Sequence, residues 1–234
     1  MIRVVIVDDE SIVVESLAMI LSCEEDLEVV GTAGDGAEAL ECVERVGPDV
    51  VVMDLKMPGM DGITATRHLV AGGRDHPTVL ALTTLATEDL ALDAIRAGAA
   101  GFCAKADPPG ALAQAIRAVA KGDAVVSPIV LGALLNRLVR PTGPSPAEAG
   151  PAEVGRGACT ARERDVLVAL SRGETNGQVA AGLFISEATV RTHIGHLRTK
   201  LGARNRAELV VRAWERGLNR PTAGSAGAGS LEPP

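Results

Sequence analysis

The first half of the chain alternates between short, almost continuously aliphatic runs and longer runs with helical periodicity. Strand-like runs cover residues 2–7, 27–33, 49–53, 78–82 and 100–103, and helical patterns cover residues 11–22, 36–46, 61–71, 87–98 and 109–121. Strands that are aliphatic at every position are buried on both faces, which is typical of parallel sheets. Five strand–helix units with short connections predict an α/β fold, a five-stranded doubly wound parallel sheet with helices on both faces. At the last helix, Asp107 is expected as the N-cap and Pro108 as the first helical residue.

The second half of the chain has a different pattern. An amphipathic helix is predicted over residues 127–139, and the stretch after it is rich in Pro, Gly and Ala without apolar periodicity, which indicates a flexible linker. Helical patterning then returns over residues 160–218, and beyond Asn219 too few apolar residues remain to form a core. We therefore expect domains at 1–121 and 158–219, a linker helix with a flexible linker at 122–157, and a disordered tail at 220–234.

Capping residues divide the second domain into helices. Thr160 and Glu163 have the spacing of a capping box, Ser186 is expected to cap a later helix, and Gly202 to end it. The tight turn before Ser186 joins two of these helices and predicts a helix-turn-helix, whose second helix lies in the major groove of DNA. The apolar residues of that second helix share one face and are expected to pack inside: Val190, Ile194, Leu197 and Leu201.

The charge of the chain is distributed unevenly between the two domains. The formal net charge is −7, yet residues 1–122 hold 9 basic and 20 acidic residues, whereas residues 158–220 hold 11 basic and 6 acidic ones. A basic second domain is compatible with a nucleic-acid partner, and equally with a solvated basic surface.

The four cysteines are scattered without paired spacing, which is typical of reduced thiols rather than of a disulfide framework or a zinc site. No signal-peptide pattern precedes the first strand, and no apolar run approaches the length of a membrane span. We therefore expect a cytoplasmic protein that is not inserted in a membrane.

Acidic residues follow two of the predicted strands. Asp8 and Asp9 come directly after the first strand, and Asp54 ends the third. The carboxyl ends of parallel strands lie at one edge of a sheet, where such sheets place their ligands. Clustered carboxylates repel one another unless a cation joins them, and Mg²⁺ prefers oxygen ligands of this kind. The pattern predicts a Mg²⁺ site at this edge.

Residues 1–121 resemble the receiver domain of bacterial two-component response regulators, which has a flavodoxin-like fold. Four motifs carry the resemblance, each at the end of a predicted strand: Asp8-Asp9-Glu10, Asp54 to Gly62, Leu82-Thr83-Thr84, and Gly101-Phe102 to Lys105.

The receiver resemblance implies a role for each site residue. Asp54 would accept a phosphoryl group from a phosphohistidine of a sensor histidine kinase, with Lys105 and the Thr83 hydroxyl contacting the phosphoryl oxygens. Asp9, Asp54 and the backbone carbonyl of Lys56 would bind Mg²⁺ directly, and Asp8 would bind it through water. Phe102 stands where the family has an aromatic residue that turns inward after Thr83 moves. Because Phe lacks the hydroxyl of the more common Tyr, this switch is expected to be less sharply two-state.

Residues 159–218 resemble the LuxR-type DNA-binding domain of the NarL/FixJ class of regulators. The motif residues are Thr160-x-Arg162-Glu163-x-x-Val166-Leu167, Gly173-x-Thr175-Asn176, Ile185-Ser186-Glu187-x-Thr189-Val190-x-Thr192-His193 and Lys200-Leu201-Gly202. The resemblance implies that Arg191, Thr192 and Gly195 face the bases of double-stranded DNA. It further implies that Thr189, Lys200 and Arg198 contact phosphates, and that the helix at 205–217 forms a homodimer contact when the protein is phosphorylated.

Together these features predict a DNA-binding transcriptional response regulator, not an enzyme, switched by Mg²⁺-dependent phosphorylation of Asp54. A second interpretation keeps DNA binding and removes phosphorylation, but the intact set of Asp8, Asp9, Asp54, Thr83 and Lys105 argues against it. A third interpretation is a Mg²⁺-dependent phosphohydrolase with an Asp nucleophile. Such an enzyme has no use for a helix-turn-helix, and its nucleophile is expected after the first strand.

Overall fold

The computed structural model describes residues 1–71, 77–84, 87–126 and 159–219. These residues form two compact units, one built on a β-sheet and one built of helices. The helix expected over 127–139, most of the expected linker and the expected tail at 220–234 lie outside the described residues. Within the described parts of the chain, no helix has both the length and the apolar character of a membrane span.

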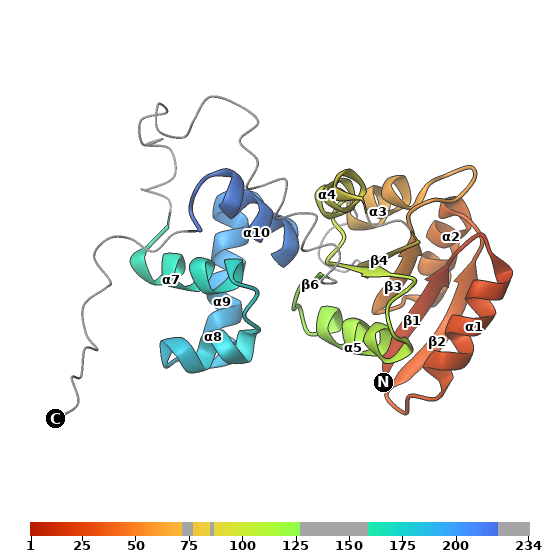
Figure 1. Cartoon of the computed structure of the whole chain (residues 1–234), viewed down its shortest axis with the longest axis horizontal. Helices are drawn as coiled ribbons and strands as arrows, with labels where there is room; N and C mark the ends of the chain where they lie inside the picture. Colours follow the sequence, from red (N-terminus) through yellow and green to blue (C-terminus); the bar gives the residue numbers. More distant parts are fainter. Residues whose placement is uncertain (72–76, 85–86, 127–158, 220–234) are drawn as a thin grey trace. The chain divides into compact units, whose positions relative to one another are not determined.

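The first unit contains a parallel sheet with the strand order β2-β1-β3-β4-β5-β6 (Figure 1). Its strands are β1 (Ile2–Val7), β2 (Leu27–Ala33), β3 (Val50–Asp54), β4 (Thr78–Thr83), β5 (Gly101–Ala104) and β6 (Val125–Val126). The order confirms a doubly wound sheet, because the chain builds outward from β1 in both directions. The sequence pattern missed β6, since two residues are too few to show a strand period, and this strand is defined by its pairing with β5.

Helices cover both faces of the sheet, as predicted. They are α1 (Ser11–Ser22), α2 (Gly36–Val46), α3 (Gly62–Ala71), α4 (Glu88–Ala97) and α5 (Pro109–Ala120). Figure 1 shows α1 and α5 on one face and α2, α3 and α4 on the other. In β1, Val4 and Ile6 belong to the core under α1 and α5, whereas Val5 and Val7 belong to the opposite core. Both faces of the strand are therefore buried, which explains why every position is aliphatic.

The predicted start of α5 was wrong by one residue. Pro108 is the N-cap and Pro109 the first helical residue, so a proline that lacks an N–H still occupies the first position. The Asp107 carboxylate does not cap this helix; it accepts a hydrogen bond from the backbone N–H of Ala104 at 2.8 Å. This contact holds the chain that leads from β5 into α5.

The second unit is built of the helices α7 (Ala161–Ser171), α8 (Asn176–Leu183), α9 (Glu187–Leu201) and most of α10 (Arg206–Glu215). The predicted caps are confirmed: Thr160 and Glu163 form a capping box, and the Ser186 side chain accepts from the backbone N–H of Thr189. Gly202 ends α9 with φ 70°, a left-handed conformation that glycine adopts without strain. Val190, Ile194, Leu197 and Leu201 all lie in the core of this unit, as their spacing predicted.

Candidate functional site

The three predicted carboxylates lie together at the carboxyl edge of the sheet. Because β1 pairs with β3, Asp8 at the end of one strand lies beside Asp54 at the end of the other. Asp8, Asp9 and Asp54 each offer a carboxylate oxygen, and these oxygens lie within 4.8 Å of one another. Asp8 and Asp54 are buried, whereas Asp9 is exposed at the mouth of the cluster.

Lys105 joins this cluster from the far side of β4. Its Nζ lies 2.8 Å from Asp54 Oδ2 and 2.6 Å from Asp8 Oδ2, and 3.8 Å from Glu10 Oε1. Burial alone lowers the pKa of Lys105, but the hydrogen bonds to Asp54 and Asp8 and the charges of both carboxylates outweigh it. The pKa of Lys105 is therefore raised above its ordinary value, and the side chain is a fixed cation in the site.

The backbone around Asp54 fixes the orientation of its carboxylate. The N–H of Lys56 donates to Asp54 Oδ1 at 3.2 Å, so each carboxylate oxygen has one donor from the protein. The start of α3 lies against the end of β3 at Gly62, where a Cβ would fall 1.9 Å from the Asp54 carbonyl oxygen. Only glycine fits this approach, which keeps α3 close beneath the acidic cluster.

Thr83 and Phe102 lie on the two strands next to the site. Thr83 is the last residue of β4 and is 1% exposed, and its carbonyl accepts from the backbone N–H of Lys105 at 2.7 Å. Phe102 lies in β5 beside Ala81 of β4, and its side chain is fully buried. Phe102 thus lies inward in this structure, and its role as a switch stays a prediction.

The acidic cluster has the donor set that a hard divalent cation requires. Three carboxylates meet one ammonium, so the site keeps an excess of negative charge that a Mg²⁺ ion would offset. Oxygens bound directly to one Mg²⁺ lie at about 2.1 Å from the ion, and an oxygen that binds through water lies farther away, so a cluster within 4.8 Å allows both kinds of contact. Asp8, Asp9 and Asp54 therefore fit the ion, while the role of the Lys56 carbonyl stays a prediction.

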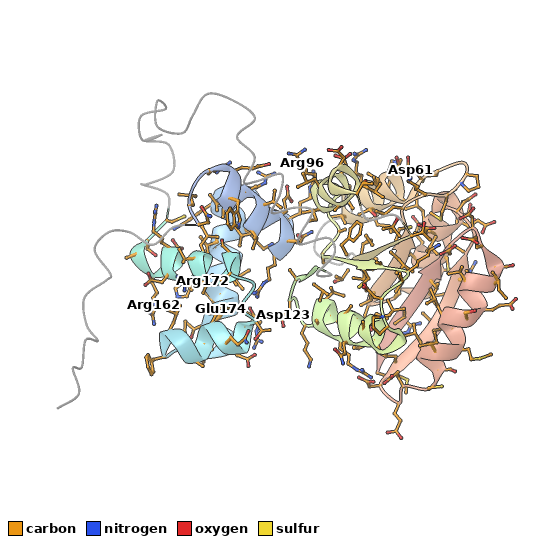
Figure 2. The ribbon with its side chains drawn as sticks, in the orientation of Figure 1. Asp61, Arg96, Asp123, Arg162, Arg172 and Glu174 are labelled. Atoms are coloured by element: carbon orange, nitrogen blue, oxygen red, sulfur yellow. The ribbon has the colours of Figure 1, made fainter. Side chains whose placement is uncertain are left out.

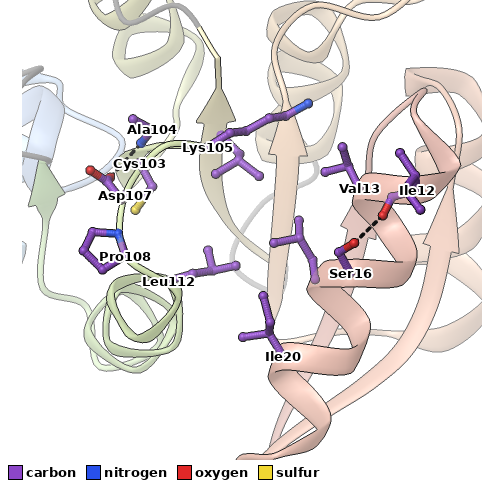
Figure 3. A pocket seen from close by; sticks show the side chains of 12 residues that line it. Ile12, Val13, Ser16, Ile20, Cys103, Ala104, Lys105, Asp107, Pro108 and Leu112 are labelled. Carbon is purple, nitrogen blue, oxygen red and sulfur yellow. Dashed lines mark hydrogen bonds between the residues drawn. The ribbon is translucent and has the colours of Figure 1, made fainter.

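An apolar cavity of about 300 Å³ opens beside the acidic cluster, between α1 and the start of α5 (Figure 3). Its walls are mostly aliphatic, and Lys105 contributes to its lining. On α1 the nearby Ile12 side chain is 66% exposed, and Met19 on the same helix is 72% exposed. The carboxylates Asp8, Asp9 and Asp54 do not line the cavity, so the charged chemistry lies at its edge.

The outward face of α9 carries the predicted DNA-contacting residues. Thr189, Arg191, Thr192 and Gly195 are exposed, and Arg198 is half-buried. Arg191 lies 3.7 Å from Glu187 in an exposed pair one helical turn apart, and the Thr192 hydroxyl donates to the Ala188 carbonyl. A Cβ at Gly195 would meet no atom within 4 Å, so open space lies over this part of the helix.

Lys200, predicted to contact a phosphate, has a protein partner in the structure. Its Nζ lies 2.6 Å from Oε2 of Glu163, whose side chain is 4% exposed. The sequence assigned Glu163 to the capping box and to the LuxR-type motif, and neither assignment indicated a second partner. Arg162, also known only as a motif residue, donates from Nη2 to the carbonyl of Leu183 (Arg162 is labelled in Figure 2).

Both domains match known family models. Residues 4–117 match the response regulator receiver domain, and residues 158–213 match the luxR family of bacterial regulatory proteins. The chain is 35% identical over 213 residues to the transcriptional regulatory protein LiaR of Bacillus subtilis, covering 91% of this chain and 97% of the relative. It is also 35% identical over 217 residues to the oxygen regulatory protein NreC of Staphylococcus carnosus, covering 92% of this chain and 98% of the relative.

A solved structure extends the match to the whole architecture. The response regulator ChrA of a heme-sensing two-component system is 40% identical to this chain and superposes with a TM-score of 0.51. The match covers 93% of this chain and 98% of ChrA. The matches thus extend over nearly the whole length of this chain and of these relatives. With its receiver domain followed by a LuxR-type helix-turn-helix domain, the chain belongs to the NarL/FixJ class of two-component response regulators.

Proposed function

We propose that Mg²⁺-dependent phosphorylation of Asp54 by a sensor histidine kinase switches the binding of this regulator to double-stranded DNA in the cytoplasm. We further propose that the phosphorylated form binds DNA as a homodimer. The observation that carries the proposal is the arrangement around Asp54. Its buried carboxylate lies 2.8 Å from the Lys105 ammonium, in one cluster with Asp8 and Asp9.

The chemistry asks little of the protein beyond position and charge. An Asp54 oxygen attacks the phosphorus of a phosphohistidine, a P–O bond forms, and the P–N bond breaks with its electron pair left on the imidazole nitrogen. Because a carboxylate attacks without losing a proton, no general base is required. Mg²⁺ held by Asp8, Asp9 and Asp54 would neutralise the charge on the phosphoryl oxygens.

Lys105 and Thr83 would then respond to the new phosphoryl group. Lys105 now binds an oxygen of Asp54, and in the acyl phosphate this ammonium is expected to bind a phosphoryl oxygen instead. The Thr83 hydroxyl, at the adjacent strand end, is expected to donate to the same group. Movement of the loop after β4 would change the packing around Phe102, which lies buried in β5 beside this strand.

On DNA, the exposed face of α9 supports the assignment of base contacts to Arg191 and Thr192. Arg191 can donate two hydrogen bonds to guanine, and the Thr192 methyl can pack on thymine. Gly195 contributes only a close approach of the backbone, and Thr189 and Arg198 are the proposed phosphate contacts. The relatives LiaR and NreC are named as transcriptional and oxygen regulators, which favours this function over a phosphohydrolase.

The test combines intact mass with DNA affinity on the full chain. Wild type, Asp54→Ala and the control Glu41→Gln, an exposed carboxylate on α2, are incubated with acetyl phosphate and Mg²⁺ or with chelator. The DNA probe is the duplex that the wild-type protein selects from a random-sequence library.

We expect a phosphate adduct in wild type and Glu41→Gln, only with Mg²⁺, and none in Asp54→Ala. The adduct should be accompanied by tighter DNA binding and by a larger mass in light scattering. DNA affinity that is the same for wild type and Asp54→Ala under all conditions would instead support a phosphorylation-independent regulator.

A further inference from the structure

The first turn of α7 contacts the ends of both helices of the helix-turn-helix. Arg162 donates from Nη2 to the carbonyl of Leu183, the last residue of α8. The next residue, Glu163, accepts from Lys200 Nζ at 2.6 Å, one residue before the end of α9. Two neighbouring side chains thus reach two different helices, and in both cases they reach the carboxyl end.

The Glu163 carboxylate is buried and accepts hydrogen bonds from two donors. Its Oε2 accepts from the backbone N–H of Thr160 at 2.8 Å as well as from Lys200. The hydrogen bond from Lys200 lowers the pKa of Glu163 below its ordinary value despite the opposing effect of burial. Without Lys200, the carboxylate would keep its capping hydrogen bond but would lose its opposing charge inside the domain.

The contact of Arg162 lies at the turn between α8 and α9. Phe184 follows Leu183 with φ 54°, and among the residues that the structure describes it is the one non-glycine residue with positive φ. A side chain in this conformation costs free energy, so the turn needs support from outside. A guanidinium at a helix carboxyl end binds the unpaired carbonyls and interacts favourably with the helix dipole.

We infer that Arg162 and Glu163 are positioning residues for DNA recognition, which fix the angle between α8 and α9 through Leu183 and Lys200. These four residues form what we call the α7 clamp. In this assignment Lys200 acts through Glu163 and makes no phosphate contact. The base-reading side chains Arg191 and Thr192 depend on the clamp, because they extend from the helix that it holds.

The length of α9 explains why a small change in its orientation would affect base recognition. Arg191 and Lys200 are nine residues apart, which corresponds to about 13 Å along a helix. A tilt of about 5° at Lys200 therefore displaces Arg191 by about 1 Å, enough to lose a base hydrogen bond of ordinary length. The clamp should thus set sequence selectivity rather than general attraction to DNA.

The experiment separates positioning from phosphate contact in the full chain. The variants are Lys200→Met, Glu163→Gln, the double variant, Arg162→Met, and the control Arg172→Met. Arg172 is an exposed basic residue at the other end of α7. Affinity is measured over a range of salt concentrations for the wild-type-selected duplex and for a duplex of random sequence. Selectivity is the ratio of the two dissociation constants.

If the clamp positions α9, Lys200→Met and Arg162→Met lower selectivity severalfold, while the salt dependence on the random duplex stays that of wild type. The double variant recovers part of the melting temperature lost in Lys200→Met, because no buried carboxylate is left without its partner, but its selectivity stays low, because the contact between α7 and α9 is still absent. Arg172→Met keeps wild-type selectivity.

The inference is overturned if Lys200→Met keeps its selectivity and lowers the salt slope on the random duplex by about one, as loss of a phosphate contact does. If Lys200→Met does not fold, Glu163→Gln decides, since Gln keeps the capping contact and Lys200 keeps its charge. Lower selectivity in Glu163→Gln supports the clamp, and wild-type selectivity overturns it. All variants are compared under one condition, so the result does not depend on whether Asp54 is phosphorylated.

Discussion

Lys105 Nζ lies 2.8 Å from Asp54 Oδ2, although 51 residues separate them in the sequence. The same ammonium lies 2.6 Å from Asp8 Oδ2, so one cation holds the ends of two adjacent strands. The side chains of Lys105, Asp54 and Asp8 are 12%, 7% and 0% exposed, which places the pair of carboxylates largely out of water. The site therefore contains its own positive charge before any metal ion or phosphoryl group arrives.

Replacing Lys105 by Met should destabilise the receiver domain, since two buried carboxylates would then face each other without an ammonium. Loss of one partner of a buried pair costs about 3 kcal/mol. Mg²⁺ should restore much of this loss, so the variant should gain more melting temperature from the ion than wild type does. Calorimetry in chelator and in Mg²⁺ measures both values, and an equal gain in the two proteins would contradict the role of Lys105 as a shared cation.

Asp9 should bind Mg²⁺ without contributing to the stability of the metal-free domain. Because its side chain is exposed, Asp9→Asn should leave the melting temperature in chelator unchanged. Wild type should gain about 2.7 kcal/mol at a Mg²⁺ concentration one hundred times the dissociation constant, and the variant should gain much less. A full Mg²⁺ shift in Asp9→Asn would remove Asp9 from the proposed metal ligands.

Gly62 should tolerate no side chain, since an added Cβ would lie 1.9 Å from the Asp54 carbonyl oxygen. We expect Gly62→Ala to lower stability by roughly 2 kcal/mol or more, as overpacking against a fixed backbone does. The matched control is Gly110→Ala in α5, where a Cβ meets nothing within 4 Å and stability should stay equal or rise. Urea unfolding of both variants measures the difference, and similar effects would show that the approach at Gly62 relaxes easily.

Replacing Gly195 by Ala should raise stability, whereas the same replacement at Gly62 should lower it. It lies inside α9, and a Cβ added there would have no atom within 4 Å, so Gly195→Ala should stabilise the second domain by about 1 kcal/mol. The chain has one Trp, Trp214 in α10, whose fluorescence reports unfolding of this domain. If the backbone at Gly195 lies close to a base, the methyl group added in Gly195→Ala should also change the duplex that the protein selects from a random library. Unchanged stability would indicate strain at this position that the open space does not reveal.

The contribution of the Glu163–Lys200 pair to the free energy of unfolding should decrease at acid pH. Lys200 lowers the folded-state pKa of Glu163, so its stabilising effect is complete above the ordinary pKa of 4.5 and is lost as pH falls through the lower folded value. The stability difference between wild type and Glu163→Gln should shrink as pH falls below about 4. Urea unfolding followed by Trp214 fluorescence checks this, and a difference that grows over this acid range would contradict the pairing.

Several features of the fold and site could be predicted because they depend on residues close in the sequence. Aliphatic runs such as Val4 to Val7 indicate strands buried on both faces, and Thr160 with Glu163 indicates a helix start. Asp8 and Asp54 could be placed at one sheet edge, since each ends a strand of a parallel sheet. In α9, residues one turn apart share a face, so the four buried positions followed from their spacing.

Contacts between distant residues were decided by the tertiary structure. Asp107 could cap α5 by its position in the sequence, but in the folded chain its carboxylate accepts from Ala104. Nothing local indicates that Gly62 lies against the Asp54 carbonyl, or that Lys200 lies 2.6 Å from Glu163 across 37 residues. The sequence by itself determined the elements of the described domains except β6, and the caps except that of α5, and it indicated which residues could do the chemistry. The packing of those elements decided which charged groups form pairs, because an ion pair requires two groups within a few ångströms in space, whatever their separation along the chain.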